Sequence, residues 1–137
     1  VTAVDFAAGA VAAAEAKARR AAVAVAFLGA DVTRLDVSVG SFDFLFDRGC
    51  YHCLRRAGNL GGYLRTVERL ARPGARMLVM AGNPDAAEPG GPPRVSAAEL
   101  CADFEPRFRI EQLTACRFED AGGAEGPTAW SLRMARR

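Results

Sequence analysis

The chain has 137 residues, of which 50% are hydrophobic and 25% are charged, a composition too apolar for a disordered protein and a length typical of one domain. Eighteen basic and sixteen acidic side chains give a net charge of +2, and no dense basic stripe is visible, so we expect no nucleic-acid partner. No apolar stretch reaches the roughly 20 residues that a membrane helix needs, which also argues against a membrane protein.

The N-terminal half alternates strand and helix signals. Residues 1–6 form a short apolar run that predicts a strand, and the alanine-rich residues 8–22 predict a helix, since alanine is the best helix former. The runs 22–28 and 42–46 predict two more strands, and residues 32–39 connect them. This alternation predicts an α/β fold with mostly parallel strands.

The C-terminal half continues the pattern. Apolar residues in 62–72 fall on one helical face, and Pro73 and Gly74 are expected to stop that helix before a strand over 76–81. Residues 83–93, rich in proline and glycine, predict a loop. Ser96 and Glu99 have the spacing of a capping box for a helix over 97–104. Two final strands, 108–117 and 128–135, are expected to pair around Gly122 and Gly123.

In open parallel sheets, ligands bind beyond the carboxyl ends of the strands. The residues that follow predicted strands are therefore the candidates for function: Asp5, Asp31 and the segment from Asp47 to His52. A carboxylate at Asp5 can accept hydrogen bonds from the hydroxyls of a ribose, or it can stabilise the start of the following helix. Asp31 can accept from an exocyclic amine such as that of adenine, or it can be a turn residue. The segment 47–52 is either a reactive loop or a turn held by a salt-bridged arginine.

Four cysteines in a chain of this length are not a disulfide framework and favour a reducing, cytoplasmic compartment. Cys50 and Cys53 have CxxC spacing, but a structural zinc site usually has a second ligand pair, which this sequence lacks. We therefore predict no metal site.

In this order, the segments VTAVDF, FLGADV, GSFDFLFDRGCYHCL and YLRTVERLARPGARMLVM resemble class I S-adenosylmethionine-dependent methyltransferases. Their small-molecule branch, with the thiopurine- and tellurite-type enzymes, is the most similar. The resemblance covers nearly the whole chain, although no single motif in it is highly specific. It implies a Rossmann-like three-layer sandwich with an antiparallel C-terminal strand, a bound S-adenosylmethionine and a small-molecule methyl acceptor.

The resemblance also implies a role for each candidate residue. Asp5, with Phe6 next to it, matches the acid that binds the ribose hydroxyls of the cofactor. Asp31 matches the residue that contacts the adenine amine, and Val32 is expected to lie against the ring. Asp47 and the residues after it match the loop that faces the sulfonium and the acceptor.

One part of the family pattern is absent from the sequence. The glycine-rich loop that follows the first strand of the family is not present, and the paired glycines of this chain are not placed to replace it. That strand belongs in the middle of the sheet, between the strands that end at Asp5 and Asp47. We therefore expect residues 1–137 to be a single methyltransferase-like domain that is a C-terminal fragment or a truncated record. The other interpretation is that the strands close up and cofactor binding is lost.

Methyl transfer from a sulfonium is an in-line displacement, so positioning supplies much of the catalysis. His52 is a candidate general base for an O–H or N–H acceptor, or else a wall of the pocket. Arg48 either orients an anionic substrate or pairs with Asp47 to hold the loop. Together, Asp47, Arg48 and His52 form the predicted catalytic set.

Two kinds of function remain open. The first is a methyltransferase that acts on a small molecule. The second is a degenerate, non-catalytic Rossmann-like module that acts in protein interaction, which the missing glycine loop would favour. A nicotinamide-dependent oxidoreductase ranks last, since it needs the same loop and a Tyr-x-x-x-Lys pair that the sequence lacks.

Overall fold

A computed structural model describes residues 1–35, 42–84, 93–119, 123 and 125–137. The predictions made for residues 36–39, for most of the loop 83–93 and for Gly122 lie outside the described residues. The described strands form a two-stranded sheet, in the order β1-β2, and a four-stranded sheet, in the order β3-β4-β6-β5. No helix in the described ranges is long and apolar enough to cross a membrane.

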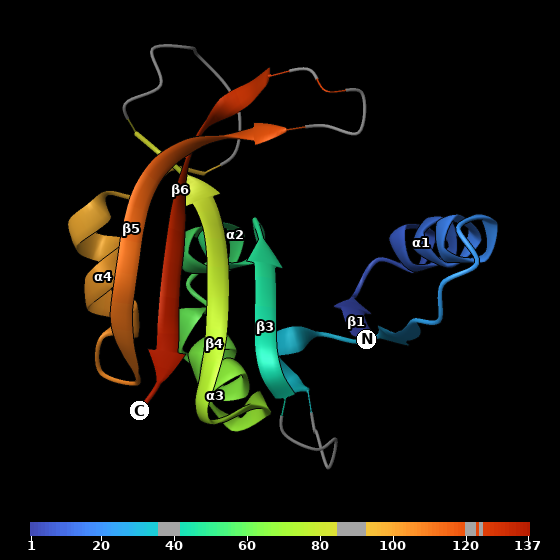
Figure 1. Cartoon of the computed structure of the whole chain (residues 1–137), viewed down its shortest axis with the longest axis horizontal. Helices are drawn as coiled ribbons and strands as arrows, with labels where there is room; N and C mark the ends of the chain where they lie inside the picture. The colour runs from blue at the N-terminus through green and yellow to red at the C-terminus, as the bar shows by residue number, and fades with distance from the viewer. Residues whose placement is uncertain (36–41, 85–92, 120–122, 124) are drawn as a thin grey trace.

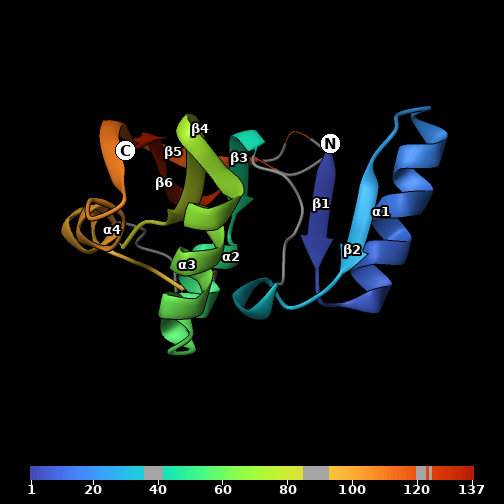
Figure 2. The same ribbon diagram turned by 90° about the horizontal axis from the view of Figure 1, so that it is seen from below.

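The N-terminal unit is a strand, a helix and a second strand. The strand β1 (Thr2–Asp5) pairs in parallel with β2 (Ala26–Gly29), and the alanine-rich helix α1 (Ala8–Arg20) connects them. The 3-10 helix η1 (Val32–Arg34) follows directly. Figure 1 shows β1 and α1 beside the four-stranded sheet, and Figure 2 shows α1 at the outer end of the molecule. None of the residues in α1 is buried, so this unit adds little to the core.

The four-stranded sheet contains β3 (Phe42–Arg48), β4 (Ala71–Gly82), β5 (Phe108–Glu119) and β6 (Glu125–Arg136). The strands β3 and β4 are parallel, whereas β6 runs antiparallel to both β4 and β5. Only the last strand is therefore reversed. This arrangement confirms the predicted mostly parallel α/β fold with an antiparallel C-terminal strand.

Three helices lie on the same side of the four-stranded sheet: α2 (Cys50–Arg56), α3 (Leu60–Leu70) and α4 (Ala97–Phe104) (Figure 2). The core fills the space between these helices and the sheet, and its largest fully buried side chains include Tyr51, Tyr63, Phe104 and Phe108. The α4 helix has the predicted capping box, in which the hydroxyl of Ser96 accepts from the backbone of Glu99 at 3.2 Å.

The structure corrects two local predictions. The segment that follows Asp47, read as a loop, begins helix α2 directly after Gly49, whose positive φ of 99° is a conformation that glycine adopts at no steric cost. The helix before β4 ends at Leu70, and Pro73 and Gly74 lie inside the strand. Pairing of β3 with β4 is irregular between Phe42 and Phe44, and such an irregularity accommodates a proline that cannot donate a hydrogen bond.

In the described residues, β1 pairs only with β2, and β3 pairs only with β4. Within the part of the chain that the structure describes, β1 and β3, which carry Asp5 and Asp47, therefore each keep one edge without a strand partner. Phe44 and Phe46, both on β3, are each 57% exposed. These edges flank the position where the sequence resemblance implies the missing first strand.

Candidate functional site

The carboxylate of Asp5 lies at the carboxyl end of β1, next to the start of α1. Its Oδ1 accepts a 2.8 Å hydrogen bond from the backbone N–H of Ala7. The contact satisfies one of the N–H groups at the start of the helix, as the alternative interpretation of this residue expected. The side chain is exposed, and this bond occupies a single carboxylate oxygen. Asp5 can therefore hold the helix start and accept from a ligand through Oδ2.

Asp31 follows β2 and caps η1. Its Oδ1 accepts from both the backbone N–H and the hydroxyl of Thr33, each at 2.8 Å. These two hydrogen bonds lower the pKa of Asp31 below its ordinary value, and the bond from the hydroxyl has the larger effect. Asp31 is therefore ionised at neutral pH, and it is a turn residue with a carboxylate exposed to solvent. Its Oδ2 lies 4.0 Å from Nε of Arg34 in an exposed ion pair.

The pairing of β1 with β2 brings Asp5 and Asp31 to one edge. Asp5 is in register with Gly29, and the backbone N–H of Ala30 donates to the carbonyl of Asp5 at 3.1 Å. Asp31 is the next residue along the chain. The two carboxylates that the sequence assigned to the adenosyl group are thus on neighbouring strand ends.

Asp47 occupies a different environment. Its side chain is only 7% exposed. Its Oδ1 accepts from the N–H of Cys50 at 2.8 Å, and its Oδ2 accepts from the N–H of Tyr51 at 3.0 Å and from the hydroxyl of Tyr63 at 2.6 Å. Burial raises the pKa of Asp47, and these hydrogen bonds oppose the rise. Both oxygens of Asp47 hold the start of α2, and its expected position facing the cofactor and the acceptor stays a prediction.

His52 is also buried, and one of its ring nitrogens has a fixed partner. The backbone N–H of Gly82 donates to Nδ1 of His52 at 2.9 Å. Nδ1 therefore carries the lone pair, and the proton of the neutral ring is on Nε2. Burial lowers the pKa of His52, and the nearby Asp47 opposes this shift. The lone-pair nitrogen of the neutral ring is thus engaged by the end of β4, and the general-base role of His52 stays a prediction.

Arg48 points away from Asp47, as successive residues of a strand do. Its Nη2 donates to the carbonyl of Glu119 at 2.8 Å, and its guanidinium carbon lies 5.1 Å from the ring centroid of Phe118. These contacts connect the carboxyl end of β3 to the end of β5, and the two roles expected for Arg48 stay predictions.

The charges of the three acids all act on one thiol of the candidate segment, that of Cys50. Burial raises the pKa of the Cys50 thiol to about 12, and the negative charges of Asp47, Asp5 and Asp31 each contribute to the rise. All three carboxylates therefore lie within electrostatic range of one thiol at the start of α2. The sequence analysis placed Cys50 in the candidate segment 47–52 and in a CxxC pair, but it gave this thiol no part in the environment of the acids.

The two apolar residues predicted to flank the cofactor differ in exposure. Phe6 is 83% exposed directly after β1. Val32, in η1, is half-buried and packs against the core. Phe6 therefore has an apolar face open to a ligand, whereas part of Val32 already contacts protein.

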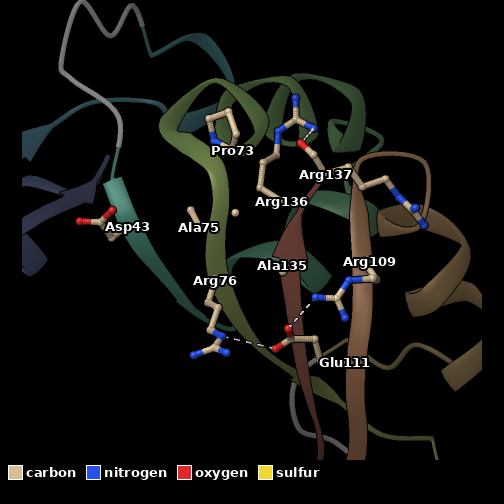
Figure 3. Close-up of a pocket in the computed structure, with 10 residues that line it drawn as sticks. Asp43, Pro73, Ala75, Arg76, Arg109, Glu111, Ala135, Arg136 and Arg137 are labelled. Carbon is tan, nitrogen blue, oxygen red and sulfur yellow. Dashed lines mark hydrogen bonds and ion pairs between the residues drawn. The ribbon is translucent and has the colours of Figure 1, made fainter.

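One cavity among the described residues lies at the other end of the sheet. It has a volume of about 670 Å³ and is lined by the starts of β3, β4 and β5 and by the end of β6 (Figure 3). Three of its charged residues pair with each other: Glu111 lies 3.1 Å from Arg109 and 3.6 Å from Arg76. Because it opens at the amino end of β4, it is not the crevice that the parallel-sheet rule predicts.

Comparison with protein families gives one match. A family described as "Methyltransferase domain" matches residues 1–79, which include Asp5, Asp31 and the whole segment 47–52. Comparison with curated protein sequences gives no match.

Several solved structures have a similar fold. A structure from work on the conversion of a disulfide bond into a thioacetal group during echinomycin biosynthesis has a TM-score of 0.82 and 21% identity. An S-adenosylmethionine-dependent methyltransferase from Methanosarcina mazei has a TM-score of 0.78 and 17% identity. A 1,6-didemethyltoxoflavin N1-methyltransferase from Burkholderia thailandensis, with its substrate and S-adenosylhomocysteine bound, has a TM-score of 0.72 and 23% identity.

The three alignments each cover 99% of this chain, but they cover 66%, 81% and 60%, respectively, of the solved structures. The chain thus spans about two thirds of the length of the first of them. At these identities, the similarity establishes a shared methyltransferase fold.

Proposed function

This chain belongs to the methyltransferase domain family, and we propose that it takes part in methyl transfer from S-adenosylmethionine to a small-molecule acceptor. S-adenosylmethionine, the cofactor expected from the sequence, is the methyl donor of this family. The observation that carries the proposal is the position of Asp5 and Asp31 on neighbouring strand ends, with Cys50 in electrostatic range of both. The similarity to the toxoflavin enzyme supports a small-molecule acceptor.

We assign the adenosyl part of the cofactor to the ends of β1 and β2. In this assignment, Asp5 accepts from the ribose hydroxyls and Asp31 accepts from the adenine amine, while Phe6 and Val32 contact the ring. The contacts support these roles because the hydrogen bonds of both acids with their own turns use Oδ1. Such bonds also fix the direction of each carboxylate before a ligand arrives, which lowers the entropy lost on binding.

When bound, S-adenosylmethionine supplies an electrophilic methyl group on a sulfonium. The part of the site next to it is framed by Asp47, His52 and Arg48, which we propose act by positioning rather than by proton transfer. Asp47 holds the start of α2, His52 holds the end of β4, and Arg48 holds the end of β5. A rigid frame of this kind suits an in-line displacement, in which alignment accounts for much of the rate.

We further propose that residues 1–137 form one methyltransferase-like domain whose sheet is completed by a strand between β1 and β3. The support is that both strands keep an edge without a strand partner in the described residues, and that the similar solved structures are longer than this chain. Unpaired backbone groups cost about 1–3 kcal/mol each when buried, so a complete sheet is more stable. The free thiols of all four cysteines support a reducing, cytoplasmic compartment.

The non-catalytic alternative requires no carboxylates at the strand ends. The retention of Asp5 and Asp31, each oriented by its own turn, is therefore an argument for the enzyme.

Calorimetric titration with S-adenosylhomocysteine tests the proposal. Asp5→Ala and Asp31→Ala are each expected to weaken binding by about tenfold, the loss of a charge-assisted hydrogen bond. Asp43→Ala is the matched control, since Asp43 is an exposed carboxylate at the amino end of β3 that pairs with Arg72. Equal affinities for all three variants would remove the ribose and adenine assignments.

A further inference from the structure

Gly62 and Thr33 are in contact where η1 packs against α3. A Cβ atom added to Gly62 would lie 2.9 Å from both Cβ and the carbonyl oxygen of Thr33, and 3.4 Å from its Cα. Two of these three atoms belong to the backbone, which cannot move aside as the tip of a long side chain can. Only glycine at position 62 therefore allows η1 to come this close to α3.

Thr33 is also the residue that holds the carboxylate of Asp31. Its backbone N–H and its hydroxyl both donate to Oδ1 of Asp31, each at 2.8 Å. A displacement of Thr33 therefore moves the carboxylate that it binds. The contact at Gly62 is thus connected to Asp31 through a single residue.

The next residue of α3, Tyr63, binds the carboxylate of Asp47. Tyr63 donates from its hydroxyl to Oδ2 of Asp47 at 2.6 Å. Two adjacent residues in the first turn of α3 therefore fix two segments. Gly62 contacts η1, which follows β2, and Tyr63 binds Asp47 near the end of β3. Because Tyr63 is buried in the core, this turn is a rigid reference for both.

We propose that Gly62 is a positioning residue for the adenosyl site: the absence of a side chain lets η1 dock on α3, and this contact sets the Asp31 carboxylate relative to Asp5 and to the start of α2. The inference rests on the proposed function for the role of Asp31, whereas the docking of η1 is a property of the fold alone. The two can therefore fail separately.

The test compares Gly62→Ala with Gly61→Ala in the full 137-residue chain. Both substitutions put alanine into the same turn of α3, so they change helix propensity alike. A Cβ at Gly61 would meet only the end of the flexible Arg65 side chain, at 3.5 Å. The first readout is amide hydrogen exchange at Thr33 and Arg34, whose N–H groups donate to Oδ1 and to the carbonyl of Asp31. The second is the affinity for S-adenosylhomocysteine.

We expect Gly62→Ala to speed amide exchange at Thr33 and Arg34 by about fivefold or more and to weaken the binding of S-adenosylhomocysteine by about tenfold. Gly61→Ala is expected to stay near the wild type in both exchange and affinity. Unchanged exchange in Gly62→Ala would overturn the docking inference. Faster exchange with unchanged affinity would overturn the positioning role. If the wild-type chain binds no S-adenosylhomocysteine, the proposed function fails, and amide exchange alone decides whether Gly62 positions Asp31.

A second variant covers the case in which Gly62→Ala does not fold. Thr33→Gly removes the Cβ that Gly62 faces and the hydroxyl that Asp31 accepts from, and it leaves α3 unchanged. It is expected to give the same faster exchange at Arg34, while the amides of α3 stay protected. Wild-type exchange at Arg34 in this variant would contradict the inference.

Discussion

The hydroxyl of Tyr63 donates a 2.6 Å hydrogen bond to the carboxylate of Asp47, and both side chains are buried between α2, α3 and the sheet. Asp47 also accepts from two backbone N–H groups at the start of α2. The helix that follows β3 is therefore held by a buried carboxylate that depends on a phenol from the next helix. Burial raises the pKa of both groups.

Replacing the phenol tests how much this bond contributes. Tyr63→Phe is expected to lower the free energy of unfolding by about 1.5–3 kcal/mol, as for a hydrogen bond to a charged group. Urea denaturation measures the change. The matched control is Tyr51→Phe, in which Asp103 loses a 2.6 Å bond but keeps its 2.8 Å contact with Arg55. An equal or larger loss in Tyr51→Phe would contradict the importance of the Tyr63 bond.

The single histidine gives a direct test of protonation. We expect an NMR titration to place the pKa of His52 below 6.5 and to find the proton of the neutral ring on Nε2. Because the folded state binds the proton less readily than the unfolded state, stability is fully present above about pH 6.5 and decreases as the pH falls below it. This decrease should continue until the folded pKa is reached.

The variant His52→Asn separates this effect from other titrations. Its amide oxygen can accept from Gly82 much as Nδ1 does, but it does not titrate. Denaturation curves between pH 5 and 8 should therefore show a smaller loss of stability at acid pH in this variant than in the wild type. The same pH dependence in both proteins would mean that another group is responsible.

Alkylation of Cys50 tests whether the three acids are close together. The thiol is expected to react slowly with iodoacetamide at pH 8, because its pKa is raised to about 12. Asp5→Ala or Asp31→Ala should speed its alkylation, by about twofold, since each removes one negative charge. Mass spectrometry of the labelled peptides follows the rate. Asp43→Ala serves as the control, and equal rates in all variants would place Asp5 and Asp31 too far away to act on the thiol.

Hydrogen exchange can also test the proposed incomplete sheet. In the described residues, Val4 in β1 and Leu28 in β2 belong to strands that pair only with each other. The helix α1 beside them has no buried residue. Val79 and Leu132 are instead fully buried in the four-stranded sheet. We expect the amides of Val4 and Leu28 to exchange about 100-fold faster than those of Val79 and Leu132 in this chain. Equal protection would show that the N-terminal unit is stable without a further strand.

Most elements of the fold were predictable because their signals are local. The helix over 97–104 with its capping box at Ser96 and Glu99 agrees residue for residue, since a cap depends only on residues three positions apart. The helix that starts at Cys50 was not predicted. Its start is stabilised by Asp47 and its packing by Tyr51 and His52, whose partners come from other parts of the chain.

The alternation of strands and helices, and the acids at the ends of three strands, were determined by the sequence, because periodicity and residue type are properties of short segments. The tertiary structure decided which of these acids remain open to a ligand. Asp5 and Asp31 bind donors only two residues away and stay exposed, whereas Asp47 is enclosed by a tyrosine 16 positions along the chain. His52 likewise has its basic nitrogen engaged by Gly82, 30 positions away. Contacts over such distances arise only when the chain packs, so no local pattern could indicate which partners Asp47 and His52 have in the folded chain.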